Sequence, residues 1–258
     1  MTLRGRRALV TGGGRGIGRA TVLGLARAGV DVAVAARTRE EIETVAEEAR
    51  TLGVRAAALT ADVGRSEDVR AVFRGAMEKL AGGIDILVNG AGIAPTAPLV
   101  KTPDELWHTV LAVNLSGVFF AMREALPGMV ERGFGRIVNI ASIAAKSGMP
   151  YVGAYAASKH GVLGLTRVAA LEVATKGVTV NAVCPGYVDT PMTDASIASI
   201  VAKTGQKPEE IRRRLEEMSP QKRMVTAEEV AALVLFLCGD EARGITGQAM
   251  NVDGGTLI

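Results

Sequence analysis

The sequence has few aromatic residues and few cysteines. Aromatic side chains make up 3% of the 258 residues, whereas 48% of the residues are hydrophobic. Aliphatic side chains must therefore fill most of the core. The two cysteines, Cys184 and Cys238, are far apart and belong to no CxxC or Cys/His group, which argues against a disulfide framework and against zinc. We expect no metal site and two small, buried thiols.

Strong charge and long apolar runs are also missing. The net charge is only +3, and the short basic run at residues 212–214 is followed at once by Glu216 and Glu217, as in a solvated helix face. No apolar run reaches the ~18 residues of a membrane span, and the amino-terminal segment has no apolar core of a secretory signal. We expect a cytoplasmic protein that binds neither nucleic acid nor membrane.

Short β-branched runs alternate with longer amphipathic segments along the chain. A capping box at residues 226–229 starts a late apolar helix that stops at Gly239. This alternation predicts one α/β domain over residues 1–258, a doubly wound parallel sheet with helices on both faces. Strands are predicted at residues 7–11, 31–36, 54–60, 84–89, 136–141, 178–184 and 249–252, and further helices at 16–28, 39–52, 66–80, 104–131 and 152–175.

One stretch interrupts the alternation of strands and helices. Residues 192–223 are more polar and contain Pro208 and Pro220. They predict an insertion of two short helices beyond the strand ends. In open α/β sheets this is where ligands bind, so we expect the insertion to form part of a substrate site.

A glycine-rich turn, Thr-Gly-Gly-Gly-Arg-Gly-Ile-Gly at residues 11–18, joins the first strand to the first helix. Glycines are needed where a turn is tight and where backbone approaches a pyrophosphate, and the N–H groups of the helix start then face the phosphates. The turn indicates a Rossmann-like dinucleotide site that includes Gly12, Gly16, Ile17 and Gly18. A plain tight turn between strand and helix is the alternative.

The end of the second strand indicates which dinucleotide is bound. An acidic residue there would hold the ribose 2′-hydroxyl of NAD, but this sequence has Ala36 followed by Arg37. A guanidinium suits a 2′-phosphate, and Arg15 in the turn is within reach of the same group. We therefore favour NADP(H) over NAD(H). The alternative is that Arg37 is a solvated strand-end arginine beside Glu40 and Glu41.

Three residues form a candidate catalytic group. Tyr155 and Lys159 are four positions apart on a predicted helix, so they share one face, and Ser142 follows the strand at 136–141. A lysine ammonium and an oxidised nicotinamide nearby would lower the pKa of the tyrosine, and the serine can hold a substrate oxygen. This set suits carbonyl reduction without a metal. A Tyr–Lys pair by itself is more often a surface pair.

Further short stretches accompany the glycine-rich turn and the catalytic group: Asp62-Val63, Asn89-Gly90-Ala91-Gly92, Asn114, Ser142, Tyr155-Ala156-Ala157-Ser158-Lys159 and Pro185-Gly186-Tyr187-Val188-Asp189-Thr190. Together with the turn, these stretches make the chain similar to the short-chain dehydrogenase/reductase family over nearly its whole length. Where the family often has Asn-Asn-Ala-Gly, this chain has Gly90 in the second position, which removes an amide that could brace neighbouring strands.

The resemblance implies roles for individual residues. Tyr155 would be the acid/base, Ser142 would orient the substrate, and Lys159 would bind the nicotinamide ribose and lower the pKa of Tyr155. Asn114 would hold a water that links Lys159 to solvent. The full set of expected cofactor contacts is Gly12, Arg15, Gly16, Ile17, Gly18, Arg37, Asp62, Val63, Asn89, Ala91, Gly92, Tyr155, Lys159, Pro185, Gly186, Val188 and Thr190.

Three residues on predicted loops beside the catalytic group are candidates for the substrate site, together with Ser142. Met149, Tyr187 and Met192 would make an adaptable, mostly apolar site, although core packing is an equal alternative for each of them. The resemblance further implies a homotetramer, built through the helices at 104–131 and 152–175 and through the segment at 244–255.

The substrate is the least determined part of the prediction. The leading hypothesis is reduction of a 3-oxoacyl thioester, with Lys176 as a basic residue near the entrance that could meet an acyl carrier protein. A lysine at a helix end is also favourable by itself. The alternatives are a 3-hydroxyacyl-CoA or 3-hydroxybutyrate dehydrogenase, an aromatic-polyketide ketoreductase, and, from another class, a non-catalytic dinucleotide-sensing regulator. A regulator would have no need for Asn114, Ser142, Tyr155 and Lys159 together.

Overall fold

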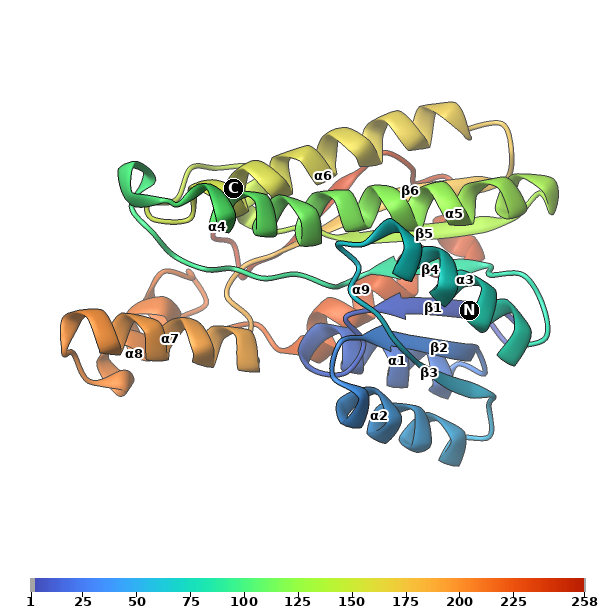
Figure 1. Ribbon diagram of the computed structural model, residues 1–258, viewed down its shortest axis with the longest axis horizontal. Coiled ribbons are helices and arrows are strands. Elements are labelled where there is room, and N and C mark those ends of the chain that lie inside the picture. Colours follow the sequence, from blue (N-terminus) through green and yellow to red (C-terminus); the bar gives the residue numbers. More distant parts are fainter. Residues whose placement is uncertain (1–2, 258) are drawn as a thin grey trace.

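A twisted parallel sheet runs through the middle of the computed structural model, which describes residues 3–257 (Figure 1). Within these residues its seven strands lie in the order β3-β2-β1-β4-β5-β6-β7, and every neighbouring pair is parallel. The doubly wound sheet predicted from the sequence is confirmed. The strands are β1 (Arg7–Thr11), β2 (Asp31–Ala36), β3 (Ala56–Thr60), β4 (Ile86–Asn89), β5 (Gly135–Ile140), β6 (Val178–Pro185) and β7 (Ala249–Val252).

Helices cover both faces of the sheet and divide the apolar interior into two cores. One core lies under α1 (Gly16–Arg27), α2 (Arg39–Thr51) and α9 (Ala227–Cys238). The other lies under α3 (Ser66–Lys79), α5 (Gly117–Glu131) and α6 (Gly153–Glu172). Both cores are almost entirely aliphatic, as the composition requires, and both cysteines are buried in them.

The strand order reverses at β1, which pairs with β2 on one side and β4 on the other. The chain therefore leaves β1 and β4 in opposite directions, and their carboxyl ends leave a crevice between them. Ligands bind at such a switch point in open α/β sheets. The same edge of the sheet carries the carboxyl ends of β5 and β6.

The long helix predicted at 104–131 is continuous but not uniform. It starts as α4 (Asp104–Leu111), widens into a π-helical turn at Ala112–Ser116, and continues as α5. This run is long and apolar enough to cross a membrane, but it packs on α3 and α6 and on the sheet as an ordinary layer helix. The sequence prediction gave one helix over these residues and did not distinguish the single π turn within it.

Two helices stand apart from the sheet, as predicted for the insertion at 192–223. They are α7 (Pro191–Thr204) and α8 (Pro208–Glu217), which lie beyond the carboxyl ends of the strands (Figure 1). Among the other elements, β1, β2, β7 and the run at 104–131 have the predicted bounds, and the remaining ends differ by at most three residues; for instance, β3 begins at Ala56 rather than at residue 54, and α6 ends at Glu172 rather than at residue 175. Residues 1, 2 and 258, which the predicted domain includes, lie outside the described part.

Candidate active site

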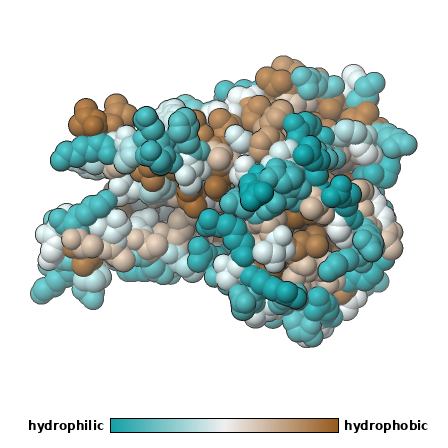
Figure 2. Space-filling model, in the orientation of Figure 1, coloured by the Kyte–Doolittle hydropathy of each residue, from teal (hydrophilic) through white to brown (hydrophobic). Residues whose placement is uncertain are grey.

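A deep cleft opens at the carboxyl edge of the sheet, between the body of the protein and the α7–α8 pair. Its volume is about 740 Å³, and Figure 2 shows the hollow between the two projecting parts of the molecule. Residues from the ends of β1, β2, β4, β5 and β6 line it, together with residues of α7. The cleft therefore combines the sheet switch point with the insertion.

The glycine-rich turn forms one end of the cleft, and its glycines are required by close backbone contacts. A Cβ on Gly18 would lie 2.1 Å from the Gly12 carbonyl oxygen, and a Cβ on Gly12, whose φ is +67°, would lie 2.6 Å from the Ala91 nitrogen. The first turn of α1 has no acidic residue and no side-chain cap, so its N–H groups remain available to a ligand. Backbone donors at a helix start suit a pyrophosphate.

Three charged side chains surround the place expected for a 2′-phosphate. Arg15, Arg37 and Glu41 all line the cleft, with Ala36 between them and the sheet. Arg15 forms an ion pair with Glu41, with 3.5 Å between guanidinium nitrogen and carboxylate oxygen. Arg37 is exposed and makes no ion pair within residues 3–257, so its guanidinium is free for a phosphate, although the same exposure agrees with the alternative of a solvated strand-end arginine. Sequence reasoning did not foresee Glu41 as a partner of Arg15.

The remaining predicted cofactor contacts divide into two groups. Asp62, Val63, Ala91 and Gly92 line the cleft, as do Pro185, Gly186, Val188 and Thr190 from the end of β6. Asn89 does not: it is 2% exposed, its amide donates to Asn139 Oδ1 at 2.8 Å, and Gly90 to Gly92 form the wall instead. The prediction that the Asn89 side chain lines the cofactor is corrected, because this side chain is buried on one face of the sheet, where its bond to Asn139 joins β4 to β5.

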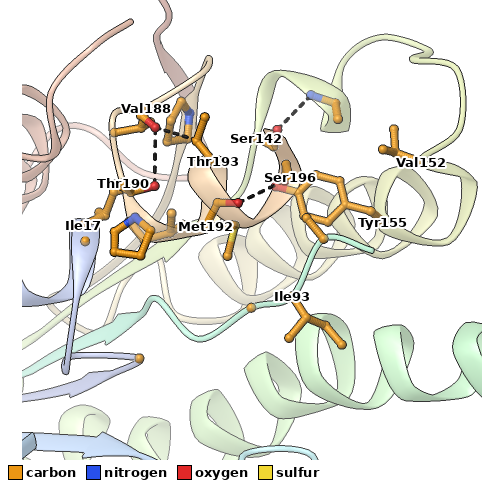
Figure 3. A pocket seen from close by; sticks show the side chains of 18 of the residues that line it. Ile17, Ile93, Ser142, Val152, Tyr155, Val188, Thr190, Met192, Thr193 and Ser196 are labelled. Atoms are coloured by element: carbon orange, nitrogen blue, oxygen red, sulfur yellow. Dashed lines mark hydrogen bonds between the residues drawn. The ribbon is translucent and has the colours of Figure 1, made fainter. Parts of the chain in front are cut away.

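Tyr155, Lys159 and Ser142 meet in the cleft, brought there by the first turns of α6 and by the end of β5. Ser142 caps the short helix at Ile143–Ala145 by accepting from Ala144 N at 3.1 Å, which fixes its orientation. Lys159 is buried and its ammonium donates to the Ile140 carbonyl at 2.7 Å. In Figure 3, Ser142 and Tyr155 lie on one side of the cavity, and Ile17, Val188 and Thr190 on the other.

Burial dominates the protonation of these groups. It raises the pKa of the Tyr155 phenol, and a hydrogen bond with Ser142 opposes that rise. It lowers the pKa of Lys159 to about 8. The sequence predicted a lowered pKa for Tyr155; in the protein by itself the direction is the opposite, because desolvation of the phenolate outweighs the hydrogen bond.

Asn114 lies in the π turn and is fully buried, and its side-chain amide forms hydrogen bonds with other groups of the protein. Its Oδ1 accepts from Ile93 N at 2.9 Å, and its Nδ2 donates to the Ile93 carbonyl at 2.9 Å and to Ser158 Oγ at 3.1 Å. These bonds tie the loop after β4 to the helix that carries Tyr155 and Lys159. A Cβ on Gly92 would lie 3.4 Å from Asn114 Oδ1 and 3.7 Å from Lys159 Nζ, so the two side chains are neighbours.

The predicted substrate residues Met149, Tyr187 and Met192 all line the outer part of the cleft. Sequence reasoning missed two residues there. Tyr151 lines the mouth, and Lys203 of α7 donates to the carbonyl and hydroxyl of Thr96 at 3.0 and 3.1 Å. Neither residue belongs to a motif, so no sequence pattern singled them out.

Lys176 was predicted to lie near the entrance of the active site, and within one chain this prediction is wrong. Lys176 follows the carboxyl end of α6, whereas Tyr155 lies in the first turn of that helix. The rise of an α-helix separates the two ends by roughly 25 Å. Lys176 also precedes β6, which puts it at the opposite edge of the sheet from the cleft.

Comparison with known proteins agrees with this geometry. Residues 12–256 match the family model described as enoyl-(acyl carrier protein) reductase. A putative ketoacyl reductase of Streptomyces coelicolor is 42% identical over 251 residues, which cover 96% of this chain and 95% of that protein. This chain belongs to the short-chain dehydrogenase/reductase family. Its family resemblance is therefore confirmed.

Two further similarities show the range of named activities. A D-beta-hydroxybutyrate dehydrogenase of Rhizobium meliloti is 39% identical over 253 residues, covering 96% of this chain and 97% of that protein. The crystal structure of an actinorhodin polyketide ketoreductase variant with NADPH superposes with a TM-score of 0.93 at 41% identity, covering 97% of both chains. The chain is thus an oxidoreductase of a family that uses a nicotinamide dinucleotide and acts between alcohol and ketone groups.

Proposed function

We propose that the chain transfers hydride between NADP(H) and a ketone or secondary alcohol, with Asn114, Ser142, Tyr155 and Lys159 as its catalytic group. The observation that carries the proposal is that the Tyr155 phenol and the Ser142 hydroxyl line the same cleft, near enough for Ser142 to lower the pKa of the phenol, while the glycine-rich turn closes the other end. Two hydroxyls side by side can hold one carbonyl oxygen. One of them can also protonate it.

In the reducing direction, bound NADPH supplies the hydride that reaches the carbonyl carbon. The Tyr155 phenol donates its proton to the carbonyl oxygen, and the Ser142 hydroxyl donates a hydrogen bond that holds this oxygen in place. The raised pKa of Tyr155 suits a proton donor, because it keeps the phenol protonated until the oxygen gains negative charge. The sum of hydride and proton is a secondary alcohol.

Lys159 and Asn114 act behind Tyr155. The ammonium uses one of its three donors on the Ile140 carbonyl, which leaves two for the ribose hydroxyls of the cofactor and for the electrostatic support of the phenolate. The side chain of Asn114 holds the loop at Ile93 and the helix at Ser158 together. We infer that a water beside this π turn returns a proton to Tyr155 through Lys159.

NADP(H) is the proposed cofactor. Arg37 is exposed, lines the cleft and makes no ion pair within residues 3–257, so its guanidinium is available to a 2′-phosphate. Arg15 can contribute if it leaves Glu41. The proposed contacts are Gly12, Arg15, Gly16, Ile17, Gly18, Arg37, Asp62, Val63, Ala91, Gly92, Tyr155, Lys159, Pro185, Gly186, Val188 and Thr190.

We propose a 3-oxoacyl thioester as the substrate, as the name of the Streptomyces coelicolor relative suggests for that protein. The surroundings of Ser142 and Tyr155 support a neutral carbonyl, since Ile93, Ala144 and Val152 line the cleft there. A free hydroxybutyrate carboxylate would find little charge to pair with. The second candidate is a polyketide ketone, favoured by the 41% identity to the polyketide ketoreductase structure.

The carrier of the acyl group and the assembly are further proposals. An acyl carrier protein is the proposed carrier, in line with the description of the matching family model. We propose one cytoplasmic catalytic domain that assembles as a homotetramer. Exposed apolar residues on the outer helices support self-association: Trp107, Phe119, Val168 and Leu171.

The test is an assay with purified protein. NADPH should be oxidised in the presence of an acetoacetyl thioester, and Tyr155→Phe should lose about 10³-fold in kcat while it still binds NADPH. Full activity of Tyr155→Phe would overturn the mechanism. Normal NADPH binding without turnover of any ketone would instead favour the dinucleotide-sensing regulator.

A further inference from the structure

Tyrosine is rare in this chain, yet every tyrosine lies in the cleft. The sequence contains three tyrosines, and Tyr151, Tyr155 and Tyr187 all line the same cavity. None of the other aromatic residues lines it, so the cleft holds a third of the aromatic side chains of the protein. Those others are Phe73, Trp107, Phe119, Phe120, Phe134 and Phe236.

Tyr151 is held in a backbone conformation that tyrosine avoids. Its φ is +68°, in the left-handed region where a Cβ is crowded and glycine is favoured. Its carbonyl accepts from Ala97 N at 2.8 Å, and an isolated parallel bridge joins Ala97 to Val152; these backbone contacts link the loop after β4 to the segment before α6. The hydrogen bond from Ala97 to Tyr151 uses only backbone atoms, so a glycine at position 151 could accept it without strain.

Core packing does not account for the tyrosine at this place. Tyr151 is 65% exposed. Little of its surface is therefore buried, and this burial does not offset the backbone strain. Strained residues that persist without packing are typical of ligand sites. The ring instead stands at the cleft mouth, where it could cover a bound molecule.

The neighbours of Tyr151 define what that molecule would be. Met149, Pro150 and Val152, its neighbours in sequence, line the cleft, as does Met192 of α7. Methionine side chains adapt to flat apolar surfaces and interact favourably with aromatic rings. The one charged side chain that α7 contributes, Lys203, is bound to Thr96. Besides Lys203 and the hydroxyls of Thr96, Ser196 and Thr204, the outer cleft is lined by tyrosine rings, methionines and aliphatic groups.

We propose that Tyr151 is a substrate-contacting residue that determines specificity, and that it selects ketones whose outer part carries an apolar ring. This inference rests on the proposed ketone reduction, and within it favours the second candidate, a ring-bearing ketone, over the linear 3-oxoacyl thioester. The carbonyl of such a ketone lies between Ser142 and Tyr155, and its ring packs between Tyr151 and Met192. An acetoacetyl group has no ring to place between Tyr151 and Met192.

The experiment compares two ketones and three variants. The substrates are a fused-ring ketone, 2-tetralone, and a linear acetoacetyl thioester. Tyr151→Gly and Tyr151→Leu both remove the ring, and only the first also relieves the strain, while Tyr151→Phe keeps both ring and strain. We expect Gly and Leu to lower kcat/KM for 2-tetralone about 10-fold, mainly through KM, and to change it less than 2-fold for the thioester. The Phe variant should retain the wild-type preference.

Several results would overturn the inference. Equal losses on both substrates would make Tyr151 a general support of the mouth, and unchanged kinetics would show that it contacts neither. A shift in oligomeric size of Tyr151→Gly by light scattering would make it an assembly contact. If wild-type protein reduces neither ketone, the proposed function fails instead. Calorimetric binding of 2-tetralone to wild type and to Tyr151→Leu then still decides whether the ring is bound by Tyr151.

Discussion

The two ends of the cleft are built in different ways. At the cofactor end, backbone atoms form most of the binding surface. Gly12 and Gly18 allow chain segments to pass within van der Waals contact, and α1 presents its free N–H groups. At the substrate end, side chains from a loop and from α7 make the walls, and their positions depend on a few hydrogen bonds such as that from Lys203 to Thr96. A backbone site tolerates almost no change, whereas a side-chain site can be reshaped one residue at a time.

This difference predicts a severe effect for Gly18→Ala. The new Cβ would stand 2.1 Å from the Gly12 carbonyl oxygen, and backbone cannot move aside cheaply. We expect a loss of roughly 3 kcal/mol of stability and no measurable NADPH binding. Thermal unfolding and fluorescence titration with NADPH measure the two effects. Gly164→Ala is the matched control, because nothing lies within 4 Å of a Cβ there; comparable damage from it would remove the basis of the comparison.

Lys159 lines the cleft between its cofactor end and its substrate end. Because Lys159 is buried, the free energy of unfolding of the protein depends on pH. Its pKa is about 8 in the folded protein against 10.5 ordinarily, so between these values the unfolded chain binds more protons than the folded one. Stability therefore rises with pH in this window, by about 2 kcal/mol from pH 8 to 9.5, as the cost of the buried charge is removed. Lys159→Met lacks this titration. Urea unfolding of both proteins at each pH should show the difference growing in favour of wild type; parallel curves would contradict the lowered pKa.

The same contrast between backbone and side chains explains what the sequence could predict. The strands, the glycine-rich turn and the positions of Ser142, Tyr155 and Lys159 follow from local patterns, because each depends on spacing within one or two elements. Asn89 was misplaced because a motif does not tell which way a side chain at a strand end points, and here it bonds to Asn139. The direction of the Tyr155 pKa shift depends on burial, which only the folded cleft determines.

Arg37→Ala tests the charged rim of the cofactor end. Arg37 makes no ion pair within the described residues, so its loss should weaken NADPH binding by about 1.5 kcal/mol, roughly 10-fold, through one lost charge-assisted contact. NADH binding should stay within 2-fold, because NADH has no 2′-phosphate. Fluorescence titration with both nucleotides gives the ratio. The same variant with unchanged NADPH affinity, or with tighter binding of NADH than of NADPH already in wild type, would reject the cofactor proposal.

Lys203→Met should have the smallest effect, and it tests how little the substrate end depends on any single contact. The Lys203 ammonium joins α7 to Thr96 across the cleft through two hydrogen bonds, but the residue is exposed, so water can replace much of what is lost. We expect KM for ketones to rise about 3-fold, worth less than 1 kcal/mol, with NADPH binding and stability unchanged.

Faster hydrogen exchange in α7 should accompany this rise, because the helix would be held less firmly against the body. Lys207→Met is the matched control, since Lys207 lies just beyond α7 and its side chain makes no hydrogen bond or ion pair within residues 3–257. A 100-fold loss in Lys203→Met alone would mean that the substrate end is as intolerant as the glycine-rich turn. The two ends of the cleft would then differ in the groups that form them, backbone or side chains, and not in how well they tolerate substitution.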